Sequence, residues 1–269
     1  MLNNDKKYEE PDWLTALQET GADIFAQSGL PTPANEDWKY SSLRPYEREG
    51  FEYTDAAPTV AAEDLPAKEL PLRIVFINGL YSAEHSDEIE ALDTVNLQKY
   101  LADGTTDIRE NILDLGNLSD TPLKAENTAH IRDGAAFILK AGQKIETPIE
   151  ILYFSSDKGL NKPKSFSRNL FILNEGAALT ILEHYAGQGS CAANHVTDIS
   201  LHPQARFQHY RLQKDSDQAW HFAHTRLMQH AESYYESLTF TAGARFSRHD
   251  VQSLLIGEKI SCNINGLYM

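Results

Sequence analysis

Short, strand-like runs that recur at a nearly fixed period are the feature that most limits how this chain can fold. Each of four blocks begins with a turn of small or polar residues, continues into an alternating strand, and reaches a second strand about ten residues later. The blocks align, at almost equal steps, through Ala177, Ala205, Ala231 and Glu258. A unit this short and this rich in strands has no room for a crossover helix, so the pattern predicts stacked coils whose strands form parallel sheets. Spacing alone leaves a β-sandwich open as the alternative.

Strand-like runs also precede the repeat. The first ends at Asn78-Gly79, a dipeptide that favours a tight hairpin turn. After about residue 127 no helix of more than two turns is predicted. The clearest predicted strands are residues 73–77, 135–140, 148–154, 169–173, 178–183, 196–201, 206–212 and 234–240.

The N-terminal part has a different texture. Residues 1–30 predict a helix that starts near Pro11-Asp12 and stops at Gly29, because Leu30-Pro31 cannot continue it. Residues 54–71, rich in Ala, Pro and acid, predict a linker or a loosely packed arm, and residues 86–118 predict helical or irregular structure.

The predicted fold class is therefore mainly β, a parallel β-helix of stacked coils preceded by a small helical N-terminal region. We divide the chain into an N-terminal helical region with its linker (residues 1–72), a transitional segment (residues 73–124) and the β-helix (residues 125–269).

Charge and composition limit the partners and the compartment. The net charge is −15, which opposes sequence-independent binding to nucleic acid or to an anionic membrane. No segment has the apolar length of a signal peptide or a membrane span. The two cysteines, Cys191 and Cys262, lie outside any metal-binding spacing and suit a reducing compartment. We predict a cytoplasmic protein with neither nucleic acid nor membrane as a partner.

Motifs for catalysis are missing from the sequence. It contains no phosphate-binding loop, nucleophile elbow or zinc-protease helix. The loop before Cys191 could expose a reactive thiol, but a plain connection between coils is the favoured interpretation. The acids Glu146, Glu150, Asp198 and Asp250 form no distinctive pair, and His249-Asp250 has no nucleophile attached. No catalytic, cofactor-binding or metal-binding residue is predicted, and the chain is expected not to be an enzyme.

Histidine is the one unusual count, because eight of ten lie between residues 184 and 249. In a strand, residues three apart point to opposite faces, so His221 and His224 should not converge. His202, His209 and His230 could meet only by stacking between coils. We expect solvent-facing histidines on the sheet exteriors, with a metal site as the minor alternative. The eight are His184, His195, His202, His209, His221, His224, His230 and His249.

Four stretches resemble the SufB/SufD family and match it in order and spacing. The most specific, PTPANEDWKYS, follows a Leu-Pro turn and places Trp38 between an acidic pair and a basic residue. The others are the strand 73–79 that ends in Asn-Gly, the segment 127–149 that contains Asp133-Gly134, and the segment 245–268 that begins Arg-Phe-Ser-Arg-His-Asp. The match covers essentially the whole chain and favours the SufD branch, because no cysteine-rich insert of the SufB type follows the Trp motif.

This resemblance implies a right-handed parallel β-helix and a scaffold role in iron–sulfur cluster assembly. It implies a complex with SufB and the ABC-type ATPase SufC, with the cluster held by the whole complex and no cofactor assigned to this chain.

Family members would continue well beyond Met269, so the sequence is expected to be a partial product, with an abbreviated homologue as the alternative. The part beyond would carry the usual contacts with SufB and SufC and a histidine implicated in assembly. An open β-helix end predicts a homodimer or a fraying last coil. Two other functions stay open: a carbohydrate-active β-helical enzyme and a histidine-rich metal-binding module.

Overall fold

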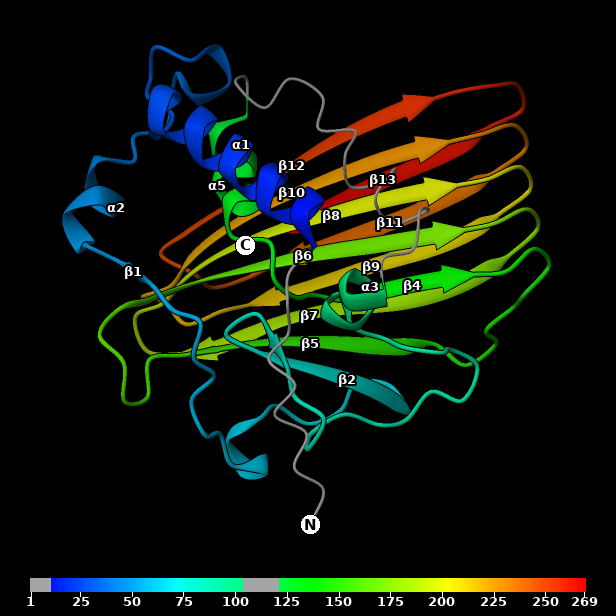
Figure 1. The fold of residues 1–269 in the computed structure, drawn as a ribbon, viewed down its shortest axis with the longest axis horizontal. Helices are drawn as coiled ribbons and strands as arrows, with labels where there is room; N and C mark the ends of the chain where they lie inside the picture. Colours follow the sequence, from blue (N-terminus) through cyan, green and yellow to red (C-terminus); the bar gives the residue numbers. More distant parts are fainter. Residues whose placement is uncertain (1–10, 104–120) are drawn as a thin grey trace.

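Strands dominate the computed structural model, which describes residues 11–103 and 121–269 (Figure 1). The helices are α1 (Asp12–Ser28), η1 (Glu36–Trp38), α2 (Arg44–Glu49), η2 (Ala62–Asp64), α3 (Leu97–Asp103) and α5 (Pro122–Ala129). The first strands are β1 (Glu52–Tyr53), β2 (Leu72–Ile77), β3 (Leu80–Tyr81), β4 (Ala136–Leu139), β5 (Ile149–Ser156), β6 (Pro163–Leu173) and β7 (Ala178–Gln188). The later strands are β8 (Ala192–Leu201), β9 (Arg206–Lys214), β10 (Trp220–Gln229), β11 (Tyr234–Thr241), β12 (Phe246–Leu255) and β13 (Ser261–Tyr268).

From β4 onward, successive strands alternate between two sheets. Sheet A has the order β1-β6-β8-β10-β12, with β4 beside β6, and sheet B has the order β13-β11-β9-β7-β5-β2-β3. All neighbours are parallel except β2 and β3, which form the hairpin predicted at Asn78-Gly79. Figure 1 shows the two sheets as stacked layers whose strands run side by side. The predicted mainly β fold of parallel stacked coils is confirmed, and the sandwich alternative is wrong.

The register of the coils is set by their corners. Ala178 pairs with Arg206, Arg206 with Tyr234, and Tyr234 with Ser261, so each coil repeats the one before it at a nearly constant step. The predicted alignment of Ala205 with Ala231 is wrong, because Ala231 lies slightly ahead of the true equivalent position. The matching residues are those with left-handed φ at each corner, namely Gly176, Gln204, Glu232 and Lys259. A small residue near a turn is a weaker marker of register than the residue that makes the turn.

The space between the sheets is half apolar and half polar. Phe171, Ile199, Phe207 and Leu227 belong to the buried apolar cluster that fills one half. Toward the other end of the sheets, the buried inward positions carry histidine, threonine, glutamate and arginine. This explains why β10 was not among the clearest predicted strands: its inward residues include His221 and Thr225, so the hydrophobic alternation is weak.

The N-terminal region covers the outer faces of the coils. Leu14 and Leu17 of α1 pack with α3 and with Leu170 of sheet A, and Figure 1 shows α1 and α5 lying together beside that sheet. Residues 54–71, predicted to be a linker or a loosely packed arm, are mostly irregular and exposed, with Val60 buried against Leu152 and Phe154 on the outer face of sheet B.

The predicted helix within residues 1–30 is confirmed over α1, and α3 supplies the helical part of residues 86–118. Residues 1–10 and 104–118 of those predictions lie outside the described residues. Among the described helices, none has both the length and the apolar character that crossing a bilayer requires.

Candidate interaction surface

Two of the four family-like stretches contact each other although they lie near opposite ends of the sequence. The Trp38 ring stacks on Phe246, with centroids 6.4 Å apart and planes 15° apart. The Arg248 guanidinium lies 4.1 Å from the Trp38 ring centroid and donates a hydrogen bond of 2.9 Å to the Asp37 carbonyl. We call the contact of Trp38 with Phe246 and Arg248 the clamp. It joins residues 37–49, which we call the N-terminal arm, to β12, so both motifs serve the fold.

A second set of contacts supports the clamp. Tyr46 of α2 packs against Trp220 and Phe222 of β10, with ring centroids 5.2 Å away in each case. Arg245 forms an ion pair of 2.7 Å with Glu49. Together these contacts place residues 37–49 across the outer face of sheet A, from β10 to β12.

The other two family-like stretches are also structural joints. The side-chain amide of Asn78 donates to the Ser156 backbone carbonyl and accepts from the Ser156 backbone N–H. These two bonds continue the pairing of β2 with β5 beyond its end. Asp133 accepts hydrogen bonds from the Tyr81 and Gly134 amides. Gly134 lies so close to β6 that a Cβ would stand 2.1 Å from the Arg168 carbonyl oxygen. Only glycine fits there.

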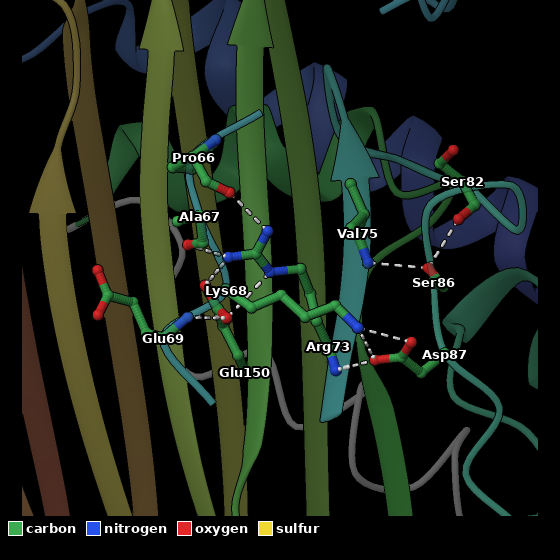
Figure 2. Close-up of polar contacts among 10 residues, drawn as sticks. All are labelled: Pro66, Ala67, Lys68, Glu69, Arg73, Val75, Ser82, Ser86, Asp87 and Glu150. Carbon is green, nitrogen blue, oxygen red and sulfur yellow. Dashed lines mark hydrogen bonds and ion pairs between the residues drawn. The ribbon is translucent and has the colours of Figure 1, made fainter. Parts of the chain in front are cut away.

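A buried ion pair fixes the first coil to the arm that crosses sheet B (Figure 2). The Arg73 guanidinium donates two hydrogen bonds to the Glu150 carboxylate, from Nε to Oε2 at 2.9 Å and from Nη2 to Oε1 at 2.8 Å. It also donates to the carbonyls of Pro66 and Ala67, while the Glu69 amide donates to Glu150. The Arg73–Glu150 pair thus holds residues 66–69 in place.

The electrostatics of Glu150 agree with a structural role. Burial would raise the pKa of Glu150, but hydrogen bonds from His184 and Arg73 lower that pKa to about 2. Such a carboxylate is ionised at every physiological pH, so it cannot serve as a general acid. Asp198 is held in the same way between Arg168 and Arg226 on the outer face of sheet A.

Four of the eight clustered histidines are buried, so the prediction of solvent-facing histidines is wrong for those four. His195, His209 and His221 point into the space between the sheets, and His184 bonds Glu150 under the arm. Polar inward positions were hidden in the sequence, because alternation shows which residues share a face but not which face is buried. The prediction that His221 and His224 face opposite ways is confirmed, since His224 lines a small pocket outside sheet A.

The inward histidines are held by hydrogen-bonding or charged partners. The Ser167 hydroxyl lies 2.6 Å from His195 Nδ1, and an Asp215 oxygen lies 3.0 Å from His221 Nδ1. Glu183 faces Tyr185, whose hydroxyl donates a bond of 2.8 Å to its carboxylate, and lies 3.1 Å from His209. Burial would raise the pKa of Glu183, but His209 and Arg211 lower it to about 2. These contacts give the inward histidines and Glu183 partners inside the coil.

The remaining candidates for chemistry have structural roles as well. Cys191 is buried, and burial raises the pKa of its thiol to about 12, which keeps the thiol protonated and unreactive. His249 accepts a bond of 2.6 Å from Arg211 at Nε2, and its neighbour Asp250 pairs with Arg248, so the two form no catalytic pair. Within the described residues, no group of three or more metal-ligating side chains converges.

The last coil, β12 with β13, carries the main exposed apolar surface. Eight of the eleven large hydrophobic side chains that are exposed in the described residues lie in it or directly beside it. In the described part of the chain, β12 and β13 each pair with a strand on one side only. We call this the last-coil surface; its apolar members are Val251, Leu254, Leu255, Ile256, Ile264, Leu267, Tyr268 and Met269. The sequence did not single out these residues, because the same pattern also describes a buried strand.

A cavity of about 470 Å³ opens between β11, β12 and β13. Thr239, Ser247 and His249 line its polar side, and Val251 and Ile264 line its apolar side. The interior of the coil is therefore continuous with the last-coil surface. Open strand edges, apolar side chains and a recess together mark a surface that further protein segments pair with or cover.

Comparisons with known proteins agree with the family-like stretches. Residues 154–269 match the family model described as SUF system FeS cluster assembly, SufBD core domain. The chain is 26% identical over 263 residues to the iron–sulfur cluster assembly SufBD family protein slr0076 of Synechocystis sp. PCC 6803, covering 90% of this chain and 57% of that protein. It is 27% identical over 254 residues to the iron–sulfur cluster assembly protein SufD of Escherichia coli K12, covering 90% of this chain and 56% of that protein.

A third relative is Protein ABCI7, chloroplastic, of Arabidopsis thaliana, which is 30% identical over 135 residues. That match covers 48% of this chain and 28% of the relative. The chain thus spans little more than half the length of the longest-matching relatives. The matches bear out the resemblance on which the predicted fold and family rested.

Proposed function

Because this chain is SufD-like and carries a SufBD core domain, we propose that it is a non-catalytic scaffold subunit of the machinery that assembles iron–sulfur clusters. Its partners in this proposal are SufB and the ATPase SufC, and its place of work is the cytoplasm. The cluster is the cargo of the whole complex, and no residue of this chain is assigned to hold it.

The family match is the observation that carries the proposal. Residues 154–269 match the SufBD core domain, and they contain the stacked strands from β6 to β13. The roles of SufB and SufC as partners rest on the family resemblance alone.

The paired carboxylates argue against the carbohydrate-active alternative. A glycosidase needs two carboxyl groups facing one cleft, one of them with a raised pKa. Glu150, Glu183 and Asp198 instead lie in buried ion pairs that lower their pKa values.

Co-purification tests the proposal. The tagged chain is co-expressed with SufB and SufC from the same cells, and SufB is expected to be retained. A tagged protein of unrelated fold, expressed in the same way, is the matched control and should retain neither SufB nor SufC. Failure of the chain to retain SufB, or equal retention of SufB by the control protein, would reject the scaffold role.

A further inference from the structure

The outer face of sheet B stays apolar beyond the part that residues 54–71 cover. Because Phe207 and Tyr235 point into the coil, the alternating positions of β9 and β11 point outward. Leu238, one of these, is 46% exposed. The strands β7, β9 and β11 each have a neighbour on both sides, so this area is distinct from the last-coil surface. We call its adjacent outward side chains the sheet B patch; they are Leu182, Tyr210, Leu212, Leu238 and Phe240.

A recess with excess positive charge adjoins the patch at the corner of the coils. Its volume is about 450 Å³, and Arg206, Lys144 and Gln208 are among the residues that line it. The Gln208 side-chain amide donates a hydrogen bond of 3.2 Å to the Tyr210 hydroxyl, which joins the recess to the patch. Glu146 is the one carboxylate among the described residues that line the recess, so the two cations outnumber it.

Neither cation of the recess forms an ion pair within the part of the chain that the structure describes. The Arg206 guanidinium lies over the Tyr234 ring, 4.6 Å from its centroid. Stacking of this kind engages the flat face of the guanidinium and leaves the N–H donors at its edge for an acceptor from outside. Carboxylates match that edge best, because they can accept two parallel hydrogen bonds from one arginine.

We propose that this face of sheet B docks an extended acidic segment of a partner protein. The carboxylates of the segment bind Arg206 and Lys144 in the recess, and its apolar side chains lie on the sheet B patch. An apolar area bordered by polar and charged groups is typical of an interaction surface, and the cations select the charge of the partner. The proposal goes beyond the scaffold role and does not rest on it.

A segment of this chemistry already lies on the same face within the chain. Residues 54–71 are largely irregular and contain four acidic residues against one lysine. In them Val60 packs against Leu152, and Asp64 lies 3.7 Å from Lys158. The row of outward side chains that begins at Leu152 runs on into the patch. The uncovered part of the face thus repeats the combination of apolar side chains and cations that residues 54–71 use. A long polyanion such as nucleic acid is disfavoured by the net charge of −15.

Fluorescence anisotropy with a labelled synthetic peptide tests the docking. The peptide has the sequence of residues 58–71, PTVAAEDLPAKELP, and is added to the full chain. Saturable binding is expected, because the tethered copy leaves the patch uncovered. Arg206→Glu reverses a charge in the recess and Leu238→Asp places a charge on the patch, so each should weaken binding roughly tenfold. Lys140→Glu is the matched control: it reverses the charge of a lysine that is 82% exposed after β4, and it should leave binding unchanged.

NMR on the unaltered chain covers the case in which a variant fails to fold. Added peptide should shift the methyl signals of Leu212 and Leu238, whereas those of Leu227, which is buried between the sheets, should stay in place. Lack of saturable binding, equal affinity in all three variants, or shifts at Leu152 without shifts at Leu238 would overturn the proposal. A dimer of the unaltered chain that Leu238→Asp breaks, seen by light scattering, would overturn it in favour of a second copy as the occupant.

Discussion

Charged side chains in this protein differ widely in how exposed they are to water. That difference decides how much each ion pair contributes to the free energy of unfolding. The Arg73–Glu150 pair is almost completely buried, with 5% and 0% of the two side chains exposed. The Lys140–Asp93 pair, by contrast, is 3.9 Å long with 82% and 90% exposed. A buried charge left without its partner is costly, whereas an exposed charge is solvated either way.

Removal of one partner should separate these two cases. Glu150→Ala leaves the Arg73 guanidinium buried without its carboxylate, and we expect the free energy of unfolding to fall by about 3–5 kcal/mol. Asp93→Ala should leave it unchanged. Urea unfolding followed by circular dichroism measures both, and equal losses in the two variants would contradict the assigned role of Glu150.

Gly79, in the β2–β3 hairpin, is a position at which a side chain would collide with β6. Gly79 has φ +82°, and a Cβ there would stand 2.2 Å from the Phe166 carbonyl oxygen. Gly142 has φ +70° but no atom within 4 Å of such a Cβ. Gly142→Ala should cost about 1 kcal/mol for the backbone conformation, and Gly79→Ala at least about 2 kcal/mol more for the clash. Thermal unfolding compares them; similar losses would mean that β6 shifts away without cost.

Among the elements, β12 is supported by a contact from outside its own sheet. It pairs with β10 on one side only in the described part of the chain, and the clamp holds its outer face. Strands such as β8, with partners on both sides, need no such support. The N-terminal arm thus stabilises the element that presents the last-coil surface.

Loss of the clamp should be visible as local opening. Trp38→Ala removes a large buried ring, and we expect a cost of about 3–5 kcal/mol together with faster amide hydrogen exchange in β12 than in β8. Tyr40→Ala, close by in the sequence and 93% exposed, is the control and should change neither quantity. Exchange that increases equally in β8 and β12 would show that the clamp stabilises the whole coil rather than its last strand.

The strands and their parallel stacking could be predicted from the sequence because backbone periodicity is a local property. The contact between Trp38 and Arg248 could not, since nothing in either motif states which distant segment it meets. The inward histidines were missed for a related reason. A strand such as β10 alternates faces, and only the fold reveals that the face bearing His221 is enclosed. The register error at Ala231 arose because conformation at Glu232, rather than residue size, defines the corner.

For the molecule as a whole, buried neutral histidines should make stability depend on acid. Burial lowers the pKa of His224 to about 4, and it lowers the pKa values of His195 and His249 in the same direction. The ordinary histidine pKa is about 6.5. Below that pH the unfolded chain takes up protons that the folded chain refuses, so acid favours unfolding. The stability these groups contribute is complete above about pH 6.5 and is lost as the pH falls toward the folded pKa values.

We therefore expect the Tm to fall continuously from pH 7 to pH 4. His224→Gln, which cannot titrate, should make that fall shallower. A second loss should follow between about pH 4.5 and pH 2, where Glu150 and Glu183 become protonated. Scanning calorimetry across the range measures both; a Tm that stays constant from pH 7 to pH 4 would contradict the buried neutral state.

The clamp also has a consequence for synthesis. Trp38 leaves the ribosome early, but its partner Arg248 follows roughly 10–40 s later at ordinary rates of translation. During that interval the coils can stack one after another, while the ring of Trp38 has neither of its clamp partners. Closure of the clamp therefore marks the completion of β12, and a nascent chain stalled before that point exposes an aromatic surface that chaperones can bind.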